Sequence, residues 1–276
     1  MTQVSSLLLP MAFVGGGNMA NALIGGLIRH GAASSAIRVV EPFAATAQAL
    51  QAQHGVAVQP AADASLKDCA LVVWAVKPQV FKEAALLTAP FVANALHLSV
   101  AAGITSNSIA QWLHTERVVR AMPNTPALVG LGQTGLYARS AVSPAEKAAI
   151  TDMMGLMGQS LWVDTEVLLD AVTALSGSGP AYVFYFLEAM VDAGVHMGLT
   201  PAQAHQLAVG TFVGASELAR SSSETPAVLR ERVTSKGGTT FAALSVMQEK
   251  GLHAILLKAM QAAQERAKNL GQELGG

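Results

Sequence analysis

The sequence predicts an α/β protein in which a parallel sheet comes first and an all-helical region follows. Short apolar runs alternate with helix-like patterns over residues 1–164, which is typical of strand–helix–strand units. After residue 164 no strand-like run appears again, and the remaining pattern is helical. We therefore expect two domains, residues 1–164 and residues 165–276.

The predicted sheet lies in the first half of the chain. Residues 71–76 and 96–102 are continuous apolar runs, as expected for strands buried on both faces. A helix is expected to begin at Pro144, because Ser143 before it can cap the free N–H groups of the first turn. Further strands are expected at 11–15, 37–41, 117–122, 135–138 and 161–164, and further helices at 18–30 and up to residue 54 after the second strand.

The second region predicts four helices, several with proline in the first turn, where its missing N–H is tolerated. They span 180–197, 201–220, 226–233 and 241–270. Residues 180–197 are apolar nearly all round, which favours burial on every side. A domain of about 110 residues can hardly enclose such a helix alone, so we expect a dimer interface here.

Composition points to the same conclusion. Hydrophobic residues make up 51% of the 276 residues and charged residues 13%, against roughly 25% charged in an average soluble chain. No uninterrupted apolar run is long enough for a membrane span, and no Lys or Arg precedes Leu7 as a signal peptide would require. We expect a soluble, cytoplasmic protein whose excess apolar surface is covered by another subunit.

Charge and metal-ligand patterns exclude other classes of partner. The formal net charge is −1 without a basic stripe, which disfavours nucleic acid. Cys69 is the single cysteine, which excludes an internal disulfide and a multi-cysteine metal site, and we expect it to be buried. The seven histidines contain no ligand pair at i, i+4, so no metal is expected.

Residues 15–20 (GGGNMA) join the first predicted strand to the first predicted helix. Gly15 permits the tight turn, Gly17 lets the backbone approach a pyrophosphate, and Ala20 keeps helix and strand close. The free N–H groups where the helix begins, at Asn18 and Met19, can receive phosphates. This pattern predicts a Rossmann-like dinucleotide-binding domain, with a glycine-rich turn that binds no ligand as the alternative.

Glu41 ends the second predicted strand, 24 residues after Gly17. An acidic side chain there binds the adenine-ribose hydroxyls in NAD-using enzymes, and its charge would repel the 2′-phosphate of NADP. Glu41 therefore favours NAD(H); an exposed glutamate facing solvent is the alternative. Arg38, three residues earlier, is expected to face elsewhere.

Five further stretches go beyond a generic dinucleotide fold. They are residues 75–79 (AVKPQ), 101–103 (AAG), 121–126 (AMPNTP), 175–182 (LSGSGPAY) and 233–240 (VTSKGGTT). Together with residues 15–20, and in this order over nearly the whole chain, they resemble pyrroline-5-carboxylate reductases. The resemblance implies hydride transfer from NAD(P)H to the C=N bond of 1-pyrroline-5-carboxylate, which gives L-proline in the last step of proline biosynthesis. It also implies a homodimer with interlocked helical domains, an active site at the subunit interface, and assembly of dimers into decamers.

The family uses NADPH, NADH or both. Many members carry a small or hydroxyl residue where this chain has Glu41. That departure disfavours a strong preference for NADPH.

Two loops should border the dinucleotide, because ligands of open α/β sheets bind beyond the carboxyl ends of the strands. They contain Ala75, Val76, Lys77, Pro78, Ala101 and Ala102. Lys77 resembles the family's cofactor-loop lysine, with a surface lysine as the alternative. Asn124 can donate and accept hydrogen bonds near the nicotinamide, and a structural turn is nearly as plausible.

Residues 235–240 are the candidate substrate loop. Gly237 and Gly238 precede a predicted helix, so their N–H groups can converge on a carboxylate, and Ser235, Thr239 and Thr240 add hydroxyls. The resemblance implies that Thr240 also reaches the ring nitrogen, which makes it the candidate catalytic residue. The alternative is an ordinary glycine turn with a threonine cap.

Three other functions fit less well. A nucleophilic serine in residues 176–180 would need a base, and no histidine is placed by a recognisable motif. A β-hydroxyacid dehydrogenase would use a lysine on the long helix, and residues 180–197 contain none. A non-catalytic dinucleotide-binding protein would have no need of the loop at 235–240.

Overall fold

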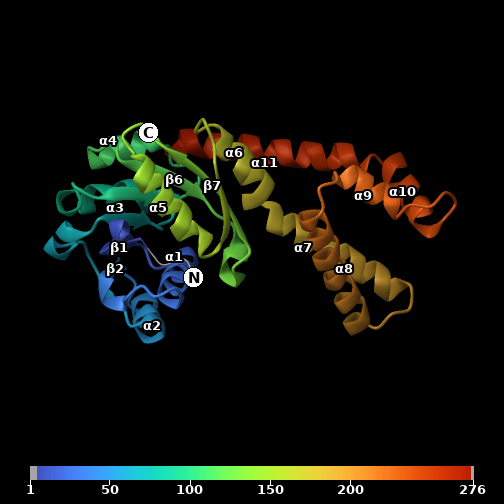
Figure 1. Ribbon diagram of the computed structural model, residues 1–276, viewed down its shortest axis with the longest axis horizontal. Coiled ribbons are helices and arrows are strands. Elements are labelled where there is room, and N and C mark those ends of the chain that lie inside the picture. The colour runs from blue at the N-terminus through green and yellow to red at the C-terminus, as the bar shows by residue number, and fades with distance from the viewer. Residues whose placement is uncertain (1–4, 275–276) are drawn as a thin grey trace. The chain divides into compact units, whose positions relative to one another are not determined.

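The computed structural model describes residues 5–274, and it contains two compact units (Figure 1). The first unit comprises the chain up to Ser178 together with the residues from Ala263 onward, and the second runs from Gly179 to Ala262. The predicted boundary after residue 164 marks the change from strands to helices. The boundary between the two compact units lies later, after Ser178. Residues 165–178 belong to the first unit with the sheet.

The first unit contains an eight-stranded sheet in the order β3-β2-β1-β4-β5-β6-β7-β8. All paired strands are parallel except β6 and β7, which are antiparallel. The strands are β1 (Met11–Val14), β2 (Ile37–Val40), β3 (Ala57–Gln59), β4 (Leu71–Trp74), β5 (Leu96–Ser99), β6 (Val118–Met122), β7 (Gly132–Ala138) and β8 (Gly158–Trp162). The chain order reverses between β1 and β4, and open α/β sheets bind ligands beside such a reversal.

The predicted α/β class is confirmed, with two differences in the sheet. Strand β3 was not predicted, because three residues of mixed exposure form no apolar run. Strands β7 and β8 begin earlier than expected, at Gly132 and Gly158. At Gly158 an added Cβ would lie 2.1 Å from the Gly132 carbonyl oxygen, so glycine is needed where these two strands meet.

Helices cover both faces of the sheet. They are α1 (Asn18–Arg29), α2 (Ala44–His54), α3 (Pro78–Thr88), α4 (Ser106–Leu113), α5 (Pro144–Gly155) and α6 (Leu168–Val172), which continues as the π-helical turn η6 (Thr173–Gly177). Short 3-10 turns are η1 (Ser6–Leu8), η2 (Ser34–Ala36), η3 (Ala64–Asp68), η4 (Ala89–Phe91) and η5 (Thr125–Val129). The predicted start of α5 is confirmed, since Ser143 and Glu146 form a capping box there.

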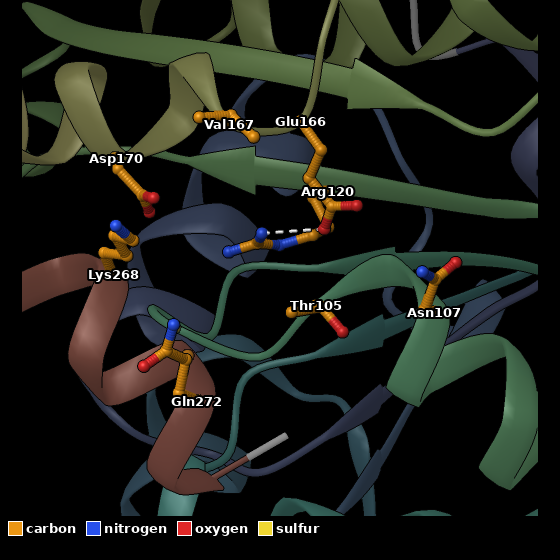
Figure 2. Close-up of a pocket in the computed structure, with 10 residues that line it drawn as sticks. Thr105, Asn107, Arg120, Glu166, Val167, Asp170, Lys268 and Gln272 are labelled. Atoms are coloured by element: carbon orange, nitrogen blue, oxygen red, sulfur yellow. Dashed lines mark hydrogen bonds and ion pairs between the residues drawn. The ribbon is translucent and has the colours of Figure 1, made fainter. Parts of the chain in front are cut away.

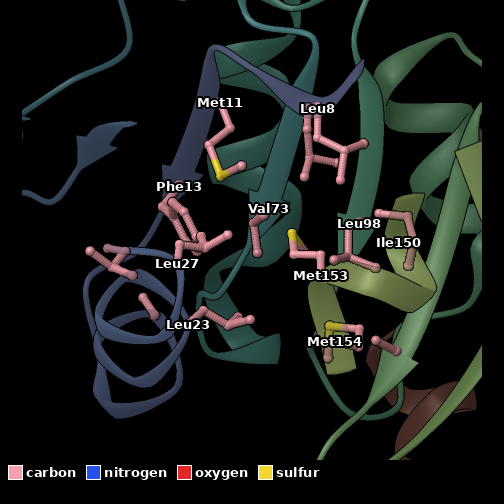
Figure 3. Close-up of a cluster of buried hydrophobic side chains, with 14 of the residues drawn as sticks. Leu8, Met11, Phe13, Leu23, Leu27, Val73, Leu98, Ile150, Met153 and Met154 are labelled. Atoms are coloured by element: carbon pink, nitrogen blue, oxygen red, sulfur yellow. The ribbon is translucent and has the colours of Figure 1, made fainter. Parts of the chain in front are cut away.

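The hydrophobic core has one part on each face of the sheet. Along β1, Met11 and Phe13 join the cluster with α1 and α5 that Figure 3 shows, which includes Leu23 and Met153. The alternate residues of β1 point to the opposite face, as the two-residue period of a strand requires. There Val14 shares a cluster with side chains of β4, α3 and α4, namely Trp74, Phe81 and Trp112.

The second unit is helical. Its helices are α7 (Gly179–His196), α8 (Pro201–Ser221), α9 (Pro226–Arg232), α10 (Thr239–Glu249) and the first part of α11 (Leu252–Leu274). The predicted single helix over 241–270 is wrong: the chain breaks at Gly251, whose φ of +68° is a left-handed conformation that ends helices. Among residues 5–274, none of the helices combines the length and hydropathy that a membrane span requires.

Helix α7 packs against α8, where Gly194 gives the close approach: an added Cβ would lie 2.9 Å from Cβ of Ala204. The expected burial of α7 on every side is not found in the isolated chain. Gly194 is buried, whereas Phe184 is 64% exposed and Tyr185 is 71% exposed. An apolar helix with such exposure has surface left for a partner.

Candidate functional site

The glycine turn after β1 has the geometry of an anion site. Gly15 has φ +95°, and an added Cβ there would lie 2.7 Å from the Ala75 carbonyl oxygen, so only glycine fits. Helix α1 begins at Asn18 without a side-chain cap, which leaves the N–H groups of its first turn available. No atom lies within 4 Å of an added Cβ at Gly17, so the space above the turn is open.

Glu41 is buried against this turn. Its side chain accepts hydrogen bonds from the backbone N–H of Gly16 through Oε2 (2.8 Å) and from that of Phe43 through Oε1 (2.8 Å). The residue is 7% exposed, which excludes the alternative of a glutamate facing solvent. A carboxylate oxygen has more than one lone pair, so Glu41 retains acceptor capacity beside the glycine turn.

Arg38 faces away from the turn, as expected. Its Nη1 donates hydrogen bonds to the Ser65 carbonyl oxygen and to Cys69 Sγ, the latter at 3.5 Å. Cys69 is buried, as predicted, and this burial raises the pKa of its thiol.

The two predicted loops lie at the same edge of the sheet as the glycine turn. Val14 pairs with Trp74, and Trp74 pairs with Ser99, so β1, β4 and β5 end side by side. Residues 75–78 and 101–102 follow directly from those ends. Lys77 directly precedes α3 and is exposed.

Asn124 follows β6 and is 7% exposed. Its Nδ2 donates a hydrogen bond to the Ser176 carbonyl oxygen (3.0 Å), and its Oδ1 accepts one from the backbone N–H of Gln133 (2.9 Å). The Ser176 hydroxyl donates to the Val172 carbonyl oxygen (3.1 Å), a contact within the helix that gives no support to a nucleophilic serine.

A partly buried ion pair, between Arg120 and Glu166, was missed by sequence reasoning (Figure 2). Arg120 Nη1 lies 2.8 Å from Glu166 Oε1, and Glu166 also accepts hydrogen bonds from the Ser106 backbone N–H (2.6 Å) and hydroxyl (2.5 Å). The pair therefore ties β6, the start of α4 and the start of α6 together. The signal in the sequence is an arginine inside an otherwise apolar strand.

The protonation state of Glu166 follows from these contacts. Burial disfavours the charged carboxylate, but the hydrogen bonds from Ser106 and the charge of Arg120 outweigh it and lower the pKa of Glu166 below its ordinary value. The neighbouring Asp170 has its pKa raised, first by burial. Asp170 and Lys268 face one another beside Arg120 in Figure 2, and together they line a cavity of about 520 Å³.

The candidate substrate loop lies in the second unit. Gly237 has φ +72°, the Gly238 N–H donates to the Ser235 carbonyl oxygen (3.0 Å), and α10 begins at Thr239 without a side-chain cap. Ser235 is exposed and Thr240 is half-buried. N–H groups of the first turn of α10 are thus available to an anion, next to hydroxyl groups.

Acidic and metal-ligating side chains do not gather in a metal site in the part of the chain that the structure describes. No group of three or more His, Cys, Asp or Glu residues there could hold a metal ion.

Family models match both parts of the chain. One described as "Pyrroline-5-carboxylate reductase dimerisation" matches residues 166–270, and one described as "NADP oxidoreductase coenzyme F420-dependent" matches residues 10–103. The chain is 42% identical to the pyrroline-5-carboxylate reductase of Pseudomonas aeruginosa over 96% of this chain and 98% of that protein. It is 35% identical to that of Escherichia coli over 95% of this chain and 98% of that protein.

Solved structures of proteins with the same description are similar to this chain over nearly its whole length. The fold matches a pyrroline-5-carboxylate reductase from Coxiella burnetii with a TM-score of 0.89 and 35% identity, over 95% of this chain and 98% of that one. It also matches a pyrroline carboxylate reductase from Plasmodium falciparum with NADP bound, with a TM-score of 0.85 and 26% identity, again over 95% and 98%.

Proposed function

The chain belongs to the pyrroline-5-carboxylate reductase family, and from this premise we propose that it reduces 1-pyrroline-5-carboxylate to L-proline with a reduced nicotinamide dinucleotide. The observation that carries the proposal is the uncapped glycine turn at the reversal point of the sheet, in a chain that also contains an uncapped glycine loop at 235–240. The first suits a pyrophosphate and the second suits a carboxylate.

The residues of the first unit fit a dinucleotide. The open space above Gly17 and the free N–H groups of the first turn of α1 suit the pyrophosphate, and the Glu41 carboxylate next to Gly16 suits the hydroxyls of an adenine ribose. We assign the cofactor to Gly15, Gly17, Asn18, Met19, Ala20, Glu41, Ala75, Val76, Lys77, Pro78, Ala101 and Ala102. Asn124 is not included in this set, because both ends of its side chain are hydrogen-bonded within the protein.

The bound cofactor supplies a hydride, which adds to the carbon of the C=N bond while a proton is added to the ring nitrogen. The protein's main task is to hold the two reacting carbons together, because a protonated imine is already electrophilic. We assign the substrate carboxylate to Ser235, Gly238, Thr239 and Thr240. The Thr240 hydroxyl then hydrogen-bonds or protonates the ring nitrogen.

Glu41 bears on which cofactor is used. Its buried carboxylate next to Gly16 would repel the 2′-phosphate of NADPH, whereas a 2′-hydroxyl can donate a hydrogen bond to it. We propose that the enzyme accepts both cofactors and prefers NADH.

We propose that the helical region, residues 165–276, forms an interlocked homodimer and that dimers assemble further into decamers. The support is the match to a dimerisation family model over residues 166–270 and the exposed apolar surface of α7. Residues 1–164 then form the cofactor domain, and the enzyme is expected to work in the cytoplasm.

The test is an absorbance assay of the purified protein with NADH and with NADPH, in the presence and absence of 1-pyrroline-5-carboxylate. We expect substrate-dependent oxidation of both cofactors, faster with NADH at equal low concentration. No substrate-dependent oxidation of either cofactor would contradict the proposed function.

A further inference from the structure

The chain changes its helical geometry just before α7. Helix α6 continues as the π-helical turn η6, in which the Ser178 N–H donates to the Thr173 carbonyl oxygen five residues back (2.8 Å). Turns of this kind are rare and are found frequently at functional sites. This one, at Thr173–Gly177, overlaps the stretch 175–182, which resembles the family.

Proline leaves one carbonyl in this turn without its ordinary donor. In a regular helix the Ser176 carbonyl oxygen would accept a hydrogen bond from the N–H of residue 180. Residue 180 is proline, which has no N–H. Ser176 is half-buried, so its carbonyl oxygen is partly shielded from water and is stabilised by a donor from elsewhere.

The side chain of Asn124 supplies that donor. Its Nδ2 lies 3.0 Å from the Ser176 carbonyl oxygen, while its Oδ1 is held by the Gln133 N–H of β7 at 2.9 Å. The side chain is thus oriented from both ends and buried. One amide connects the end of β6, the start of β7 and the π-helical turn.

The turn is also packed closely on the end of β6. An added Cβ at Gly177 would lie 2.6 Å from Cε of Met122, the far end of a flexible side chain, so the backbone of Gly177 lies close against Met122. Met122 ends β6 and lies two residues before Asn124. The same strand end therefore contacts the turn by packing and by a hydrogen bond.

We propose that Asn124 is a positioning residue, whose side-chain amide replaces the N–H that Pro180 lacks and thereby holds residues 176–178 in place for hydride transfer. The part of this inference that concerns hydride transfer rests on the proposed function. The pairing of Asn124 with the Ser176 carbonyl does not depend on the proposed function. It can be tested without an activity assay.

The test is a double-mutant cycle of Asn124→Ala and Pro180→Ala, since alanine at position 180 restores an N–H to the helix. Hydrogen–deuterium exchange of the peptide covering residues 172–182 reports on the turn directly. We expect exchange at least tenfold faster in Asn124→Ala, and a smaller increase, threefold or less, when the same change is made in the Pro180→Ala protein. Equal increases in the two backgrounds would overturn the pairing.

The matched control is Pro201→Ala, the same change in the first turn of α8, which has its own capping box. Asn124→Ala should increase exchange of residues 172–182 as much in that background as in the unaltered protein. A rescue by Pro201→Ala as well would show that removal of any helix-start proline compensates, and would overturn the specific role of Pro180.

Kinetics separate a positioning role from direct binding of the cofactor. We expect Asn124→Ala to lower kcat at least tenfold, with the KM for NADH changed less than threefold. In the double variant with Pro180→Ala, log kcat should recover at least half of the decrease. An increase in KM for NADH that Pro180→Ala does not recover would identify Asn124 as a cofactor ligand and overturn the positioning role. If the unaltered protein has no activity at all, the proposed function fails and the exchange measurements still decide the pairing.

Discussion

Glu41, His97 and Thr240 are single residues whose surroundings define their chemistry. Glu41 was predicted from the sequence as an acidic residue at a strand end, and burial against Gly16 is what the structure adds. His97 had no predicted role, because a histidine in an apolar run gives no sign of its partners. Thr240 is assigned through the resemblance, and its exposure is compatible with contact to a substrate.

Glu41→Ser is expected to shift cofactor preference towards NADPH. Removal of the buried carboxylate removes its repulsion of the 2′-phosphate, and the serine hydroxyl can donate a hydrogen bond to that phosphate. The ratio of kcat/KM for NADPH to kcat/KM for NADH should rise at least tenfold, measured in the absorbance assay. Glu83→Ser, the same change on the exposed side of α3, is the control and should leave the ratio unchanged. An unaltered ratio in Glu41→Ser would remove Glu41 from cofactor selection.

Thr240→Ala is expected to lower kcat about 100-fold, which is the lower end of what a positioned proton donor contributes. Cofactor affinity, measured by fluorescence titration, should stay within about threefold, because the hydroxyl is assigned to the imine. Thr240→Ser keeps the hydroxyl and should retain most of the turnover. Equal turnover in Thr240→Ala and the unaltered protein would exclude this residue from the chemistry.

His97 is expected to make the fold less stable at acidic pH. The residue is 1% exposed on β5, accepts a hydrogen bond from Trp74 Nε1 at 3.1 Å, and has its pKa lowered to about 4, first by burial and then by the charge of Arg117. Above about pH 6.5 the imidazole is neutral in both the folded and the unfolded chain and contributes no pH dependence. Between about pH 6.5 and pH 4 the unfolded chain binds a proton that the folded chain does not, so stability falls as the pH falls, by up to about 1.4 kcal/mol per pH unit.

The measurement is urea unfolding at pH 7.5, 6 and 5, followed by tryptophan fluorescence. Trp74, Trp112 and Trp162 all lie in the first unit, so the signal reports on that unit. His97→Gln should show a smaller loss of stability between pH 7.5 and pH 5 than the unaltered protein. His253→Gln, a change at an exposed histidine of α11, should keep the original pH dependence. The same slope in His97→Gln as in the unaltered protein would contradict the prediction.

At the scale of elements, the Arg120–Glu166 pair connects three segments that are distant in sequence. Glu166→Gln is expected to lower the free energy of unfolding by about 3 kcal/mol, because the buried Arg120 then loses the carboxylate with which it forms its ion pair. Glu116→Gln is the control: it alters an ion pair with Arg139 in which the glutamate side chain is 59% exposed, and should cost no more than about 1 kcal/mol. Urea unfolding followed by tryptophan fluorescence measures the free energy of unfolding of both variants. Equally small decreases in the two variants would contradict a stabilising role of Glu166.

The elements also show which parts of the fold the sequence could predict. Strands β1, β2, β4, β5 and β6 and helices α1 and α5 were located because their apolar runs and capping residues are local signals. Strand β3 and the antiparallel pairing of β7 depend on neighbours in the sheet and left no such signal. The break at Gly251 was missed, because a glycine within a helical pattern is also tolerated in helix interiors.

At the scale of the whole molecule, the exposed apolar surface of α7 is expected to be covered in a dimer. Phe184→Glu should shift the protein towards monomer and abolish activity, because a charge would then have to be buried in the subunit interface. Analytical ultracentrifugation measures the assembly. Leu87→Glu, on α3 in the first unit and 66% exposed, is the control and should leave the dimer intact. A Phe184→Glu protein that is still a dimer would exclude this face of α7 from the interface.

The α/β class, the all-helical second region, the glycine turn at residues 15–20 and the resemblance to a reductase family could all be predicted from the order of the amino acids. These follow from local patterns, which depend on residues close together in the chain. Three contacts became visible in the folded chain alone: Glu41 accepts a hydrogen bond from Gly16, Glu166 pairs with Arg120, and Asn124 donates to the carbonyl oxygen of Ser176. The two residues of each pair lie 25, 46 and 52 positions apart in the chain, so no local sequence pattern contains both. The folded structure brings them together, because polar groups removed from water require hydrogen-bond partners.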